Sequence, residues 1–390
     1  MNFKLIDGGI CAVEGVRAWG IKEEGKGLAL IVGEGRAAGV FTENKIMAAP
    51  LFITQKHLSS GRLSAIIANS GNANSFTGNR GVENAEKMAG IAAEALGIDS
   101  SSVAVASTGK IGRQLDMVLI EKQFSSIFKN LKRSQEASDA AARAIMTTDS
   151  RKKEIAIELD GVHIGAIAKG SGMIDPKMGT MLSFIYTDAD IAEETLKRCL
   201  KSSTDKSFNM VVVDGDMSTN DMALLVATAH NGKIEEERFQ RGLDFVCMKL
   251  ARMMARDGEG ATKLITAIVT GAKSQDDARM AAKSIVRSNL VKCAIFGEDP
   301  NWGRVIAAIG SSSAEIDPKK ITLKFGNGTE EVTFVENGEI IQQSYTYNTN
   351  NIMKEKDIII SVDFGIGDRD AVALGCDLSD EYVRINAEYV

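Results

Sequence analysis

Two kinds of hydrophobic pattern alternate along the chain, and their order predicts a mixed α/β (α+β) fold. Short apolar runs rich in β-branched residues are typical of strands, whereas apolar residues three and four positions apart are typical of amphipathic helices. Because the two alternate irregularly, we expect layered mixed and antiparallel sheets flanked by helices. The expected strands are Leu63–Ala68, Leu182–Thr187, Met210–Val213 and Leu264–Thr270. The expected helices are Val82–Leu96, Met117–Leu131, Ser134–Met146, Ile191–Lys201, Glu235–Arg256 and Asp276–Arg287.

The stretch EIAIELDGVHIGAIA, Glu154 to Ala168, predicts antiparallel pairing. An Asp-Gly pair between two β-rich runs is the strongest short-range signal for a β-hairpin, so we expect the turn at Asp160-Gly161. The final part of the chain, about 288–390, contains the strand-like runs ITLKF, EVTFV and DIIISVDFG. These runs indicate a smaller C-terminal β-rich lobe.

Composition and charge argue against several classes of protein. Of 390 residues, 44% are apolar and 25% are charged, as in an ordinary globular protein, and no apolar run approaches the ~20 residues that span a bilayer. The net charge of -6 lacks a clustered basic stripe to offset it, which argues against nucleic-acid binding. Residues 1–15 include Lys4, Asp7 and Glu14 and no long apolar core, which argues against a secretory signal. We expect a cytoplasmic protein.

Cysteine and histidine offer little for catalysis. The five cysteines are scattered and form no CxxC pair, so we expect them to be reduced core residues. The three histidines form neither an HExxH motif nor a close pair, and no metal site is expected. His163, in the run VHIGAIA, is interpreted as a hydrogen-bonded residue of a sheet. A histidine-dependent enzyme stays open, but nothing favours one, and a general base here need not be histidine.

Two loop-like stretches resemble known motifs without matching them. GEGRAAG, Gly33 to Gly39, lacks the Lys-Ser/Thr of a phosphate-binding loop and the spacing of a dinucleotide-binding loop, so we expect a tight turn. DGDMSTND, Asp214 to Asp221, has Thr219 at the sixth position of a calcium loop and Leu225 at the twelfth, where glycine and glutamate belong. We therefore expect a polar turn there.

Small and polar residues also follow two predicted strands. NSGNANSFTGNRG, Asn69 to Gly81, follows one of them, and STGKIGR, Ser107 to Arg113, follows the apolar run VAVA. Glycine lets backbone N–H groups approach an anion or a carbonyl closely. In the second stretch, Thr108 and Gly109 could offer one hydroxyl and one N–H group to an oxyanion. For each stretch alone, a plain turn remains the alternative.

The stretch KGSGMIDPKMGTML places Thr180 directly after Gly179, at the start of an expected strand. A threonine hydroxyl needs a base beside it to act as a nucleophile. Cleavage of the Gly179-Thr180 bond would create an α-amine, a group whose pKa is ordinarily about 7.7 to 8.0, close to working pH. The small Gly179 leaves room for the hydroxyl to attack the preceding carbonyl, the N-to-O acyl shift that begins such a cleavage.

With these residues in view, the chain resembles the ornithine acetyltransferases (glutamate N-acetyltransferases) of the cyclic arginine pathway, self-cleaving enzymes with an N-terminal threonine nucleophile. The resemblance runs nearly end to end and in family order. Its motifs are GLALIV, AGVFTENK, ANSGNANSFTG, STGKIGR, AIMTTDS, AKGSGMIDPKMGTML, VDGDMSTND, GEGATK, EDPNWGR and GCDLSDEYVRINAEY.

The resemblance implies the N-terminal-nucleophile-like fold shared by this family and related aminopeptidases. It implies self-cleavage at Gly179-Thr180 into an α chain, 1–179, and a β chain, 180–390, which pair as an α₂β₂ heterotetramer. It also implies ping-pong acetyl transfer from N-acetylornithine to glutamate through acetyl-Thr180, without a resident cofactor. Whether acetyl-CoA is a further co-substrate stays open. The implied site residues are Thr108 and Gly109 as the oxyanion hole, Thr180 as the nucleophile, and Thr147, Lys169, Thr180, Glu259 and Asn386 as substrate contacts.

Three departures from the family pattern bear on substrate choice. Gly179 replaces the usual alanine, Lys110 stands where a small apolar residue usually follows the oxyanion pair, and the sequence stops at Val390, so a later Ser or Thr contact is expected to be missing. Two alternatives stay open. One is an N-terminal-threonine aminopeptidase or amidohydrolase of similar fold, and the other is a non-catalytic protein that binds acylated amino acids.

Overall fold

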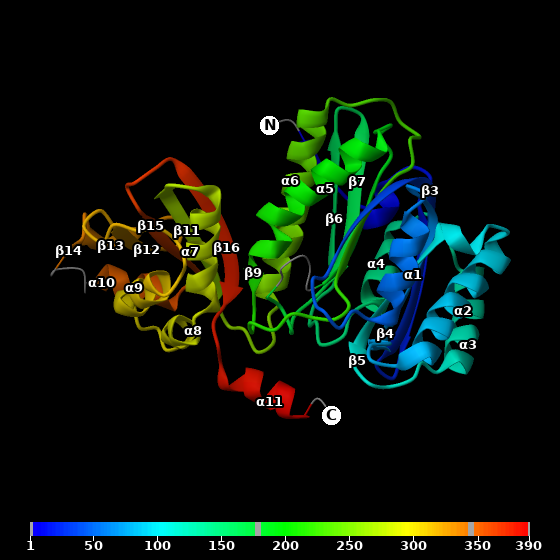
Figure 1. Cartoon of the computed structure of the whole chain (residues 1–390), viewed down its shortest axis with the longest axis horizontal. Helices are drawn as coiled ribbons and strands as arrows, with labels where there is room; N and C mark the ends of the chain where they lie inside the picture. Colours follow the sequence, from blue (N-terminus) through cyan, green and yellow to red (C-terminus); the bar gives the residue numbers. More distant parts are fainter. Residues whose placement is uncertain (1–2, 176–180, 342–346, 389–390) are drawn as a thin grey trace. The chain divides into compact units, whose positions relative to one another are not determined.

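The computed structural model describes residues 3–175, 181–341 and 347–388, which form two compact units (Figure 1). The first unit contains residues 3–170, 181–209 and 217–250 of the described chain. The second contains Ser171–Asp175, Met210–Asp216 and residues 251–388. Each unit is built on its own mixed sheet with helices around it, so the predicted mixed α/β class is confirmed.

In the first unit, nine strands within the described residues form one sheet in the order β1-β6-β7-β8-β10-β3-β4-β5, with β2 paired to β3. These strands are β1 (Phe3–Ile6), β2 (Arg17–Glu23), β3 (Lys26–Phe41), β4 (Arg62–Asn72), β5 (Val103–Lys110), β6 (Lys153–Leu159), β7 (Val162–Lys169), β8 (Leu182–Thr187) and β10 (Met222–Ala227). The helices are α1 (Ala49–Leu58), α2 (Gly78–Leu96), α3 (Met117–Lys129), α4 (Gln135–Ala144), α5 (Glu193–Lys206) and α6 (Glu236–Arg256), the last of which ends in the second unit.

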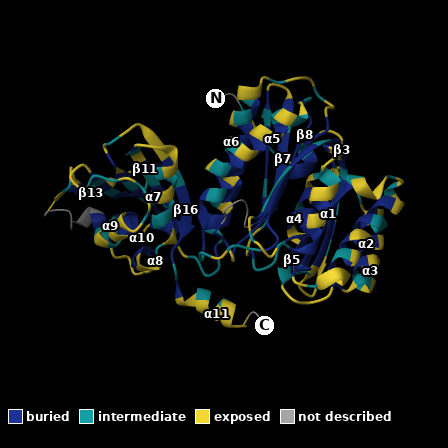
Figure 2. Cartoon of the chain, in the orientation of Figure 1, coloured by how far each residue is buried: buried dark blue, intermediate teal, exposed yellow. Residues whose placement is uncertain are grey.

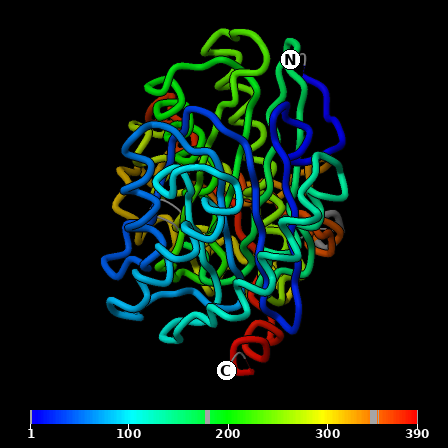
Figure 3. The backbone as a smooth tube through the Cα atoms, turned by 90° about the vertical axis from the view of Figure 1, so that its right-hand side faces the viewer, coloured from blue at the N-terminus to red at the C-terminus, as the bar shows by residue number. Residues whose placement is uncertain are grey.

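The sheet of the first unit folds back on itself into two arms, which β3 connects. One stretch of β3, from Gly27 to Arg36, pairs with β4, and the stretch from Arg36 to Phe41 pairs with β10. β7 and β5 are five strands apart, about 24 Å in a flat sheet. The Nζ atom of Lys169 at the end of β7 nevertheless lies 3.2 Å from the hydroxyl oxygen of Thr108 at the end of β5. The two arms therefore face each other. Figure 3 shows β2 and β3 as a long blue hairpin.

Alternating side chains of the β4–β5 arm supply two different cores. Ile66 points toward the facing arm, where its cluster includes Phe184 of β8 and Leu224 of β10. Its neighbour Ile67 belongs to a second cluster with Met88 of α2 and Phe124 of α3, because successive side chains of a strand point to opposite faces. Figure 2 shows the central strands of this unit mostly dark blue, with yellow on the helices around them. This packing fixes the strand ends that carry the candidate site.

The tight turn predicted for Gly33 to Gly39 is wrong, because these residues continue β3. The register with β4 shifts between Val32 and Gly35, which marks a β-bulge. A side chain at Gly35 would overlap the backbone of Ala227. The glycines therefore allow close packing between strands from inside a strand, although their spacing in the sequence is typical of a turn.

Most of the other local predictions agree with the structure. Asp160 and Gly161 have φ angles of 53° and 82° and form the two-residue turn between β6 and β7. The strand expected at Met210–Val213 is reduced to β9, Val211–Val212, because a 3₁₀ turn occupies Phe208–Met210. Four cysteines are buried as expected, but Cys293 is exposed, so that part of the cysteine prediction is wrong.

In the second unit, seven strands within the described residues form a sheet in the order β14-β13-β12-β15-β11-β16-β9. With β9, the strands are β11 (Leu264–Ala272), β12 (Thr322–Gly326), β13 (Glu331–Glu336), β14 (Glu339–Ile340), β15 (Asp357–Asp363) and β16 (Arg369–Cys376). The helices are α7 (Gln275–Arg287), α8 (Asn289–Phe296), α9 (Trp302–Gly310), α10 (Tyr347–Lys354) and α11 (Asp380–Glu388).

The second unit is larger than the predicted lobe of about 288–390. β11 occupies a central position between β15 and β16, and α7 packs its apolar face, including Ala282 and Ile285, into the same core. Both elements precede residue 288, so they cannot be separated from the lobe. No helix within the described residues combines the length and apolarity needed to cross a membrane.

Candidate active site

The candidate site of the first unit begins where β4 and β5 end side by side. The two strands are parallel, and Ser70 and Gly71 lie opposite Thr108 and Gly109. Buried hydrogen bonds hold these ends together: the Ser107 hydroxyl donates to the Asn69 side-chain oxygen over 2.5 Å. The polar runs after both predicted strands thus meet at one edge of the sheet.

A second amide side chain fixes the backbone at this edge. The Nδ2 atom of Asn220 donates to the carbonyl oxygen of Ser107 over 2.9 Å and to that of Ala73 over 2.6 Å. Asn220 is buried, with 4% of its surface exposed. Because one amide donates to both carbonyl oxygens, the segment just after β4 is held against the end of β5, next to Thr108.

Gly109 is required at its position. Its φ angle is 131°, a value that residues with a side chain rarely adopt, and a side chain there would overlap the backbone of Gly71. No larger residue fits this close approach of the two strand ends. Glycine at this position therefore lets the ends of β4 and β5 pack backbone against backbone beside Thr108.

The ammonium group of Lys169 contacts the hydroxyl oxygen of Thr108 over 3.2 Å, and both residues are buried. A lysine ammonium has three donors and no acceptor, so Thr108 accepts in this contact. The hydroxyl hydrogen of Thr108 is then available to another acceptor. A cation and a hydroxyl donor therefore lie together beside Gly109, an arrangement suited to binding developing negative charge.

Asp149 ties the loop after α4 to the end of β7. Its carboxylate accepts the N–H group of Thr147 over 3.0 Å, the N–H group of Gly170 over 2.7 Å and the ammonium of Lys153 over 2.7 Å. The side chain of Asp149 is 0% exposed and that of Lys153 is 1% exposed. Asp149 thus places Thr147 close to the residue that follows Lys169.

The charge balance around Asp149 keeps it ionised. Burial by itself raises the pKa of Asp149, but the charges of Lys169 and Lys153 and the hydrogen bonds from Lys153 and Gly170 outweigh it and lower the pKa to about 2. Sequence reasoning missed Asp149, although it follows the paired threonines of AIMTTDS. A lone acidic residue ahead of a lysine pair is too common a pattern to identify such a buried ion pair.

The other predicted substrate contacts, Glu259 and Asn386, lie together in the second unit. The amide nitrogen of Asn386 on α11 donates to a carboxylate oxygen of Glu259 over 2.8 Å. Tyr382 lies one turn earlier on α11 and accepts the Asn386 amide with its carbonyl oxygen over 3.0 Å. Burial, together with the carboxylates of Asp214 and Glu259, raises the pKa of the Tyr382 phenol.

The structure therefore gathers Thr108, Gly109, Thr147 and Lys169 in the first unit and Glu259 and Asn386 in the second. The predicted cleavage pair, Gly179 and Thr180, lies outside the described residues. The following strand, β8, begins at Leu182, which lies directly opposite Lys169. No group of three or more His, Cys, Asp or Glu within the described residues is arranged to hold a metal ion.

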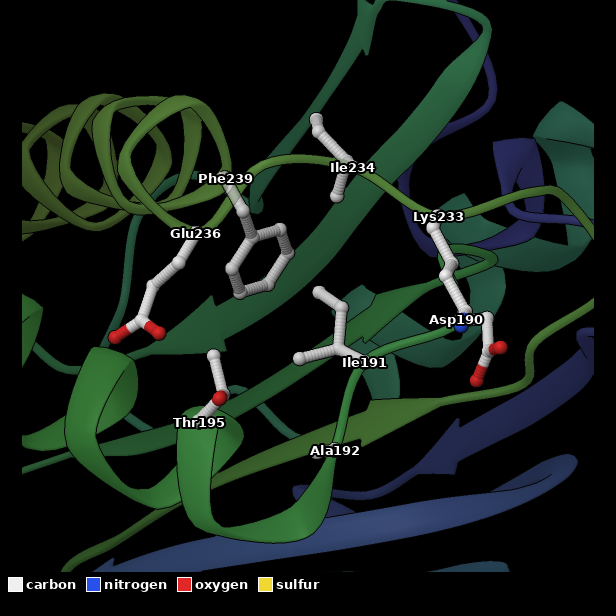
Figure 4. A pocket seen from close by; sticks show the side chains of 8 residues that line it. All are labelled: Asp190, Ile191, Ala192, Thr195, Lys233, Ile234, Glu236 and Phe239. Atoms are coloured by element: carbon white, nitrogen blue, oxygen red, sulfur yellow. The ribbon is translucent and has the colours of Figure 1, made fainter.

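A pocket of about 140 Å³ lies elsewhere in the first unit, near the start of α5 and α6 (Figure 4). Its lining residues are Asp190, Ile191, Ala192, Thr195, Lys233, Ile234, Glu236 and Phe239. Asp190 already pairs with Arg36 over 2.7 Å, and Glu236 with Arg198 over 2.8 Å. None of the predicted site residues lines this pocket, so it is separate from the candidate active site.

Comparison with known proteins relates nearly the whole chain to one family. The family model of the ArgJ family matches residues 13–390. A glutamate N-acetyltransferase of Methanosarcina mazei is 55% identical over 392 residues, which cover 99% of each chain. An arginine biosynthesis bifunctional protein ArgJ of Caldanaerobacter subterraneus is 44% identical over 383 residues, covering 95% of this chain and 94% of that protein.

Among the solved structures that are similar to part of the chain is one from Bacillus halodurans. The crystal structure of the arginine biosynthesis bifunctional protein argJ from Bacillus halodurans is 42% identical, with a TM-score of 0.50. The match covers 53% of this chain and 99% of the solved chain. The solved chain is therefore about half as long as the chain described above.

Proposed function

The chain belongs to the ArgJ family, and on this basis we propose that it is a glutamate N-acetyltransferase of arginine biosynthesis. It takes the acetyl group from N-acetylornithine, releases ornithine, and passes the acetyl group to glutamate. The structural observation that carries this proposal is the buried contact between Lys169 and Thr108 beside Gly109. The Thr108 hydroxyl, oriented by this contact, and the N–H group of Gly109 are the two donors that an acyl-transfer oxyanion needs.

The nucleophile in this proposal is Thr180, exposed as a chain terminus by self-cleavage. Its hydroxyl attacks the carbonyl carbon of Gly179, the peptide nitrogen leaves as the free α-amine of Thr180, and water hydrolyses the resulting ester. The products are an α chain, 1–179, and a β chain, 180–390. The length of the solved relative supports this step. The match includes nearly all of that solved chain but only 53% of this chain. A β chain of 211 residues would be a similar share, about 54% of the 390 residues.

Acetyl transfer then proceeds by a ping-pong mechanism. The Thr180 amine accepts the proton of the Thr180 hydroxyl, whose oxygen attacks the acetyl carbonyl of N-acetylornithine. The hydroxyl of Thr108 and the N–H group of Gly109 stabilise the oxyanion, and ornithine leaves with the proton. The neutral amine of glutamate next attacks acetyl-Thr180, and N-acetylglutamate leaves. No resident cofactor takes part.

The remaining predicted residues hold the substrate. Lys169 pairs with the substrate carboxylate, and Glu259 pairs with the side-chain ammonium of N-acetylornithine. Thr147, which is held by Asp149, and Asn386, which is bonded to Glu259, complete the set of contacts. The carboxylate contacts (Lys169 and Thr147) and the ammonium contacts (Glu259 and Asn386) lie in different parts of the chain, so substitutions can remove one set without changing the other.

The same proposal includes the assembly and the setting of the enzyme. The α and β chains pair as an α₂β₂ heterotetramer in the cytoplasm, and the substrates are small molecules. An assay with acetyl-CoA and glutamate distinguishes a monofunctional from a bifunctional enzyme, because acetylation of glutamate by acetyl-CoA would be a second activity. Either result is compatible with acetyl transfer from N-acetylornithine as the main activity.

The proposed function is tested by incubating the purified protein with N-acetylornithine, with and without glutamate. The expected result is equimolar ornithine and N-acetylglutamate when glutamate is present. Release of ornithine and acetate at the same rate without glutamate would identify a hydrolase, and no turnover of any acetylated amino acid would identify a binding protein. Thr180→Ala is the matched inactive control.

A further inference from the structure

The segment Ser171–Asp175, called here the tail segment, is held in the second unit by several polar contacts. The N–H groups of Met173 and Ile174 donate to the carboxylate of Asp214, the latter over 2.8 Å. The carbonyl oxygen of Ile174 accepts the N–H group of Val213 over 2.7 Å. The tail segment therefore runs beside the end of β9.

Two ion pairs hold the C-terminal residue of the tail segment, Asp175. Asp175 is buried, with a side-chain exposure of 5%, and its two carboxylate oxygens accept from Lys283 over 2.9 Å and from Arg287 over 2.8 Å. Both cations stand on α7, one helical turn apart. Charge-assisted hydrogen bonds of this kind are stronger than neutral ones, so the tail segment is tied firmly to this helix.

The near end of the tail segment contacts Glu259. The carbonyl oxygen of Ser171 accepts the backbone N–H group of Glu259 over 2.9 Å. Gly172 lies directly against the Glu259 carboxylate, and a methyl group at Gly172 would overlap its carbon and both oxygens. Asn386 donates to one of these oxygens from α11. The Glu259 carboxylate is thus held between α11 and a residue that has no side chain.

We propose that the tail segment positions the Glu259 carboxylate to receive an ammonium group, with Gly172 as the positioning residue that leaves the space this carboxylate occupies. The inference rests on the proposed function, in which Glu259 binds the side-chain ammonium of N-acetylornithine. It adds a dependence between the two chains. After cleavage, the tail segment belongs to the α chain and Glu259 to the β chain, so the cation subsite of the β chain is completed by the α-chain end.

Gly172 offers a clean probe, because its backbone conformation is one that residues with side chains also adopt. The three heavy atoms nearest to an added methyl group all belong to the flexible end of Glu259, so the carboxylate can shift while the backbone stays in place. Gly172→Ala should therefore fold and be cleaved normally but bind the substrate ammonium poorly. Gly90→Ala is the matched control, since a side chain at Gly90 in α2 meets open space.

The test compares kcat/KM for N-acetylornithine in four proteins: wild type, Gly172→Ala, Gly90→Ala and Glu259→Gln. We expect a loss of about tenfold or more for Gly172→Ala and Glu259→Gln, the size of a lost hydrogen bond to a charged group, and no loss for Gly90→Ala. The double variant Gly172→Ala with Glu259→Gln should be no slower than Glu259→Gln alone, because both changes remove the same interaction.

Intact masses separate failure of this inference from failure of the proposed function. If the wild type itself is uncut or inactive, the proposed function fails. If the wild type is cut and active, three results for Gly172→Ala would each overturn the inference. The first is an unchanged kcat/KM, and the second is a loss of kcat/KM that adds to the loss caused by Glu259→Gln. The third is blocked cleavage. Should Gly172→Ala be insoluble, Asp175→Asn decides, since it loosens the tail segment without adding atoms: unchanged kcat/KM for N-acetylornithine would again overturn it.

Discussion

Lys169 donates a hydrogen bond from its Nζ atom to the hydroxyl oxygen of Thr108 across 3.2 Å, although five strand-to-strand steps separate their strands in the sheet. The contact exists because the sheet folds back on itself. The contact joins the end of β7 to the end of β5, and in it the Thr108 hydroxyl oxygen accepts the hydrogen bond from Lys169. The hydroxyl hydrogen is then available to a substrate oxyanion.

Thr108→Ala should slow the chemical step far more than it weakens substrate binding. Loss of one oxyanion donor costs ~10² to 10³ in kcat, about 2.7 to 4 kcal/mol. Thr108→Ser retains the hydroxyl and is the matched control, which should keep most of the activity. Steady-state kinetics with N-acetylornithine and glutamate measure both effects. A variant in which KM rises while kcat stays at the wild-type value would assign Thr108 to binding instead.

Asp149→Asn should destabilise the protein strongly. The substitution leaves the buried ammonium of Lys153 without its carboxylate, and breaking one side of a buried pair typically costs about 3 to 5 kcal/mol. Glu136→Gln breaks the exposed pair with Lys132 and should cost under about 1 kcal/mol. Urea unfolding of both variants at one protein concentration provides the comparison. Equal decreases in the free energy of unfolding for the two variants would show that the ion pair of Asp149 stabilises the protein no more than a surface ion pair.

The stabilising effect of Asp149 should disappear in acid. Its folded-state pKa of about 2 is depressed below the ordinary 3.8, which corresponds to roughly 2 kcal/mol of stability. That contribution is present above pH 4 and is lost as the pH falls through about 2, because the unfolded chain takes up the proton first. The difference in the free energy of unfolding between wild type and Asp149→Asn should therefore become smaller as the pH falls from 4 to 2. A difference that stays constant over this range would contradict the depressed pKa.

Local sequence patterns predicted the elements whose signals lie within a few residues. The Asp160-Gly161 turn depends on backbone conformations that these residues favour, and the helix at Val82–Leu96 ends at Gly97, which adopts the left-handed conformation. Thr108 and Gly109 stood out because a hydroxyl residue and a glycine followed an apolar strand. In these cases the residue type alone limits the possible structures.

Long-range packing decided the features that the sequence did not predict. Gly35 looks like a turn residue in sequence, but it lies inside β3, where the backbone of Ala227 excludes any side chain. Asp149 acquires its role from Lys153 and Gly170, and the latter is 21 residues away. The fold-back of the sheet that joins Lys169 to Thr108 is likewise set by how β3 divides its pairing between β4 and β10.

The pH profile tests which group replaces histidine as the general base. If the Thr180 amine accepts the hydroxyl proton, it must be neutral in the free enzyme, so kcat/KM for N-acetylornithine should rise with pH through a single inflection. The ordinary pKa of a chain-terminal amine is about 7.7 to 8.0. A profile that is flat from about pH 6 to 9, with chemistry shown to be rate-limiting, would mean that the amine is not the base.

The intact mass of the purified protein under denaturing conditions tests the central claim, self-cleavage at Gly179-Thr180, most directly. We expect two chains for the wild type, of 179 and 211 residues, with the larger beginning TMLSF. Thr180→Ala should remain one chain of 390 residues and transfer no acetyl groups. A wild-type protein that stays a single full-length chain and still transfers acetyl from N-acetylornithine to glutamate would contradict the account.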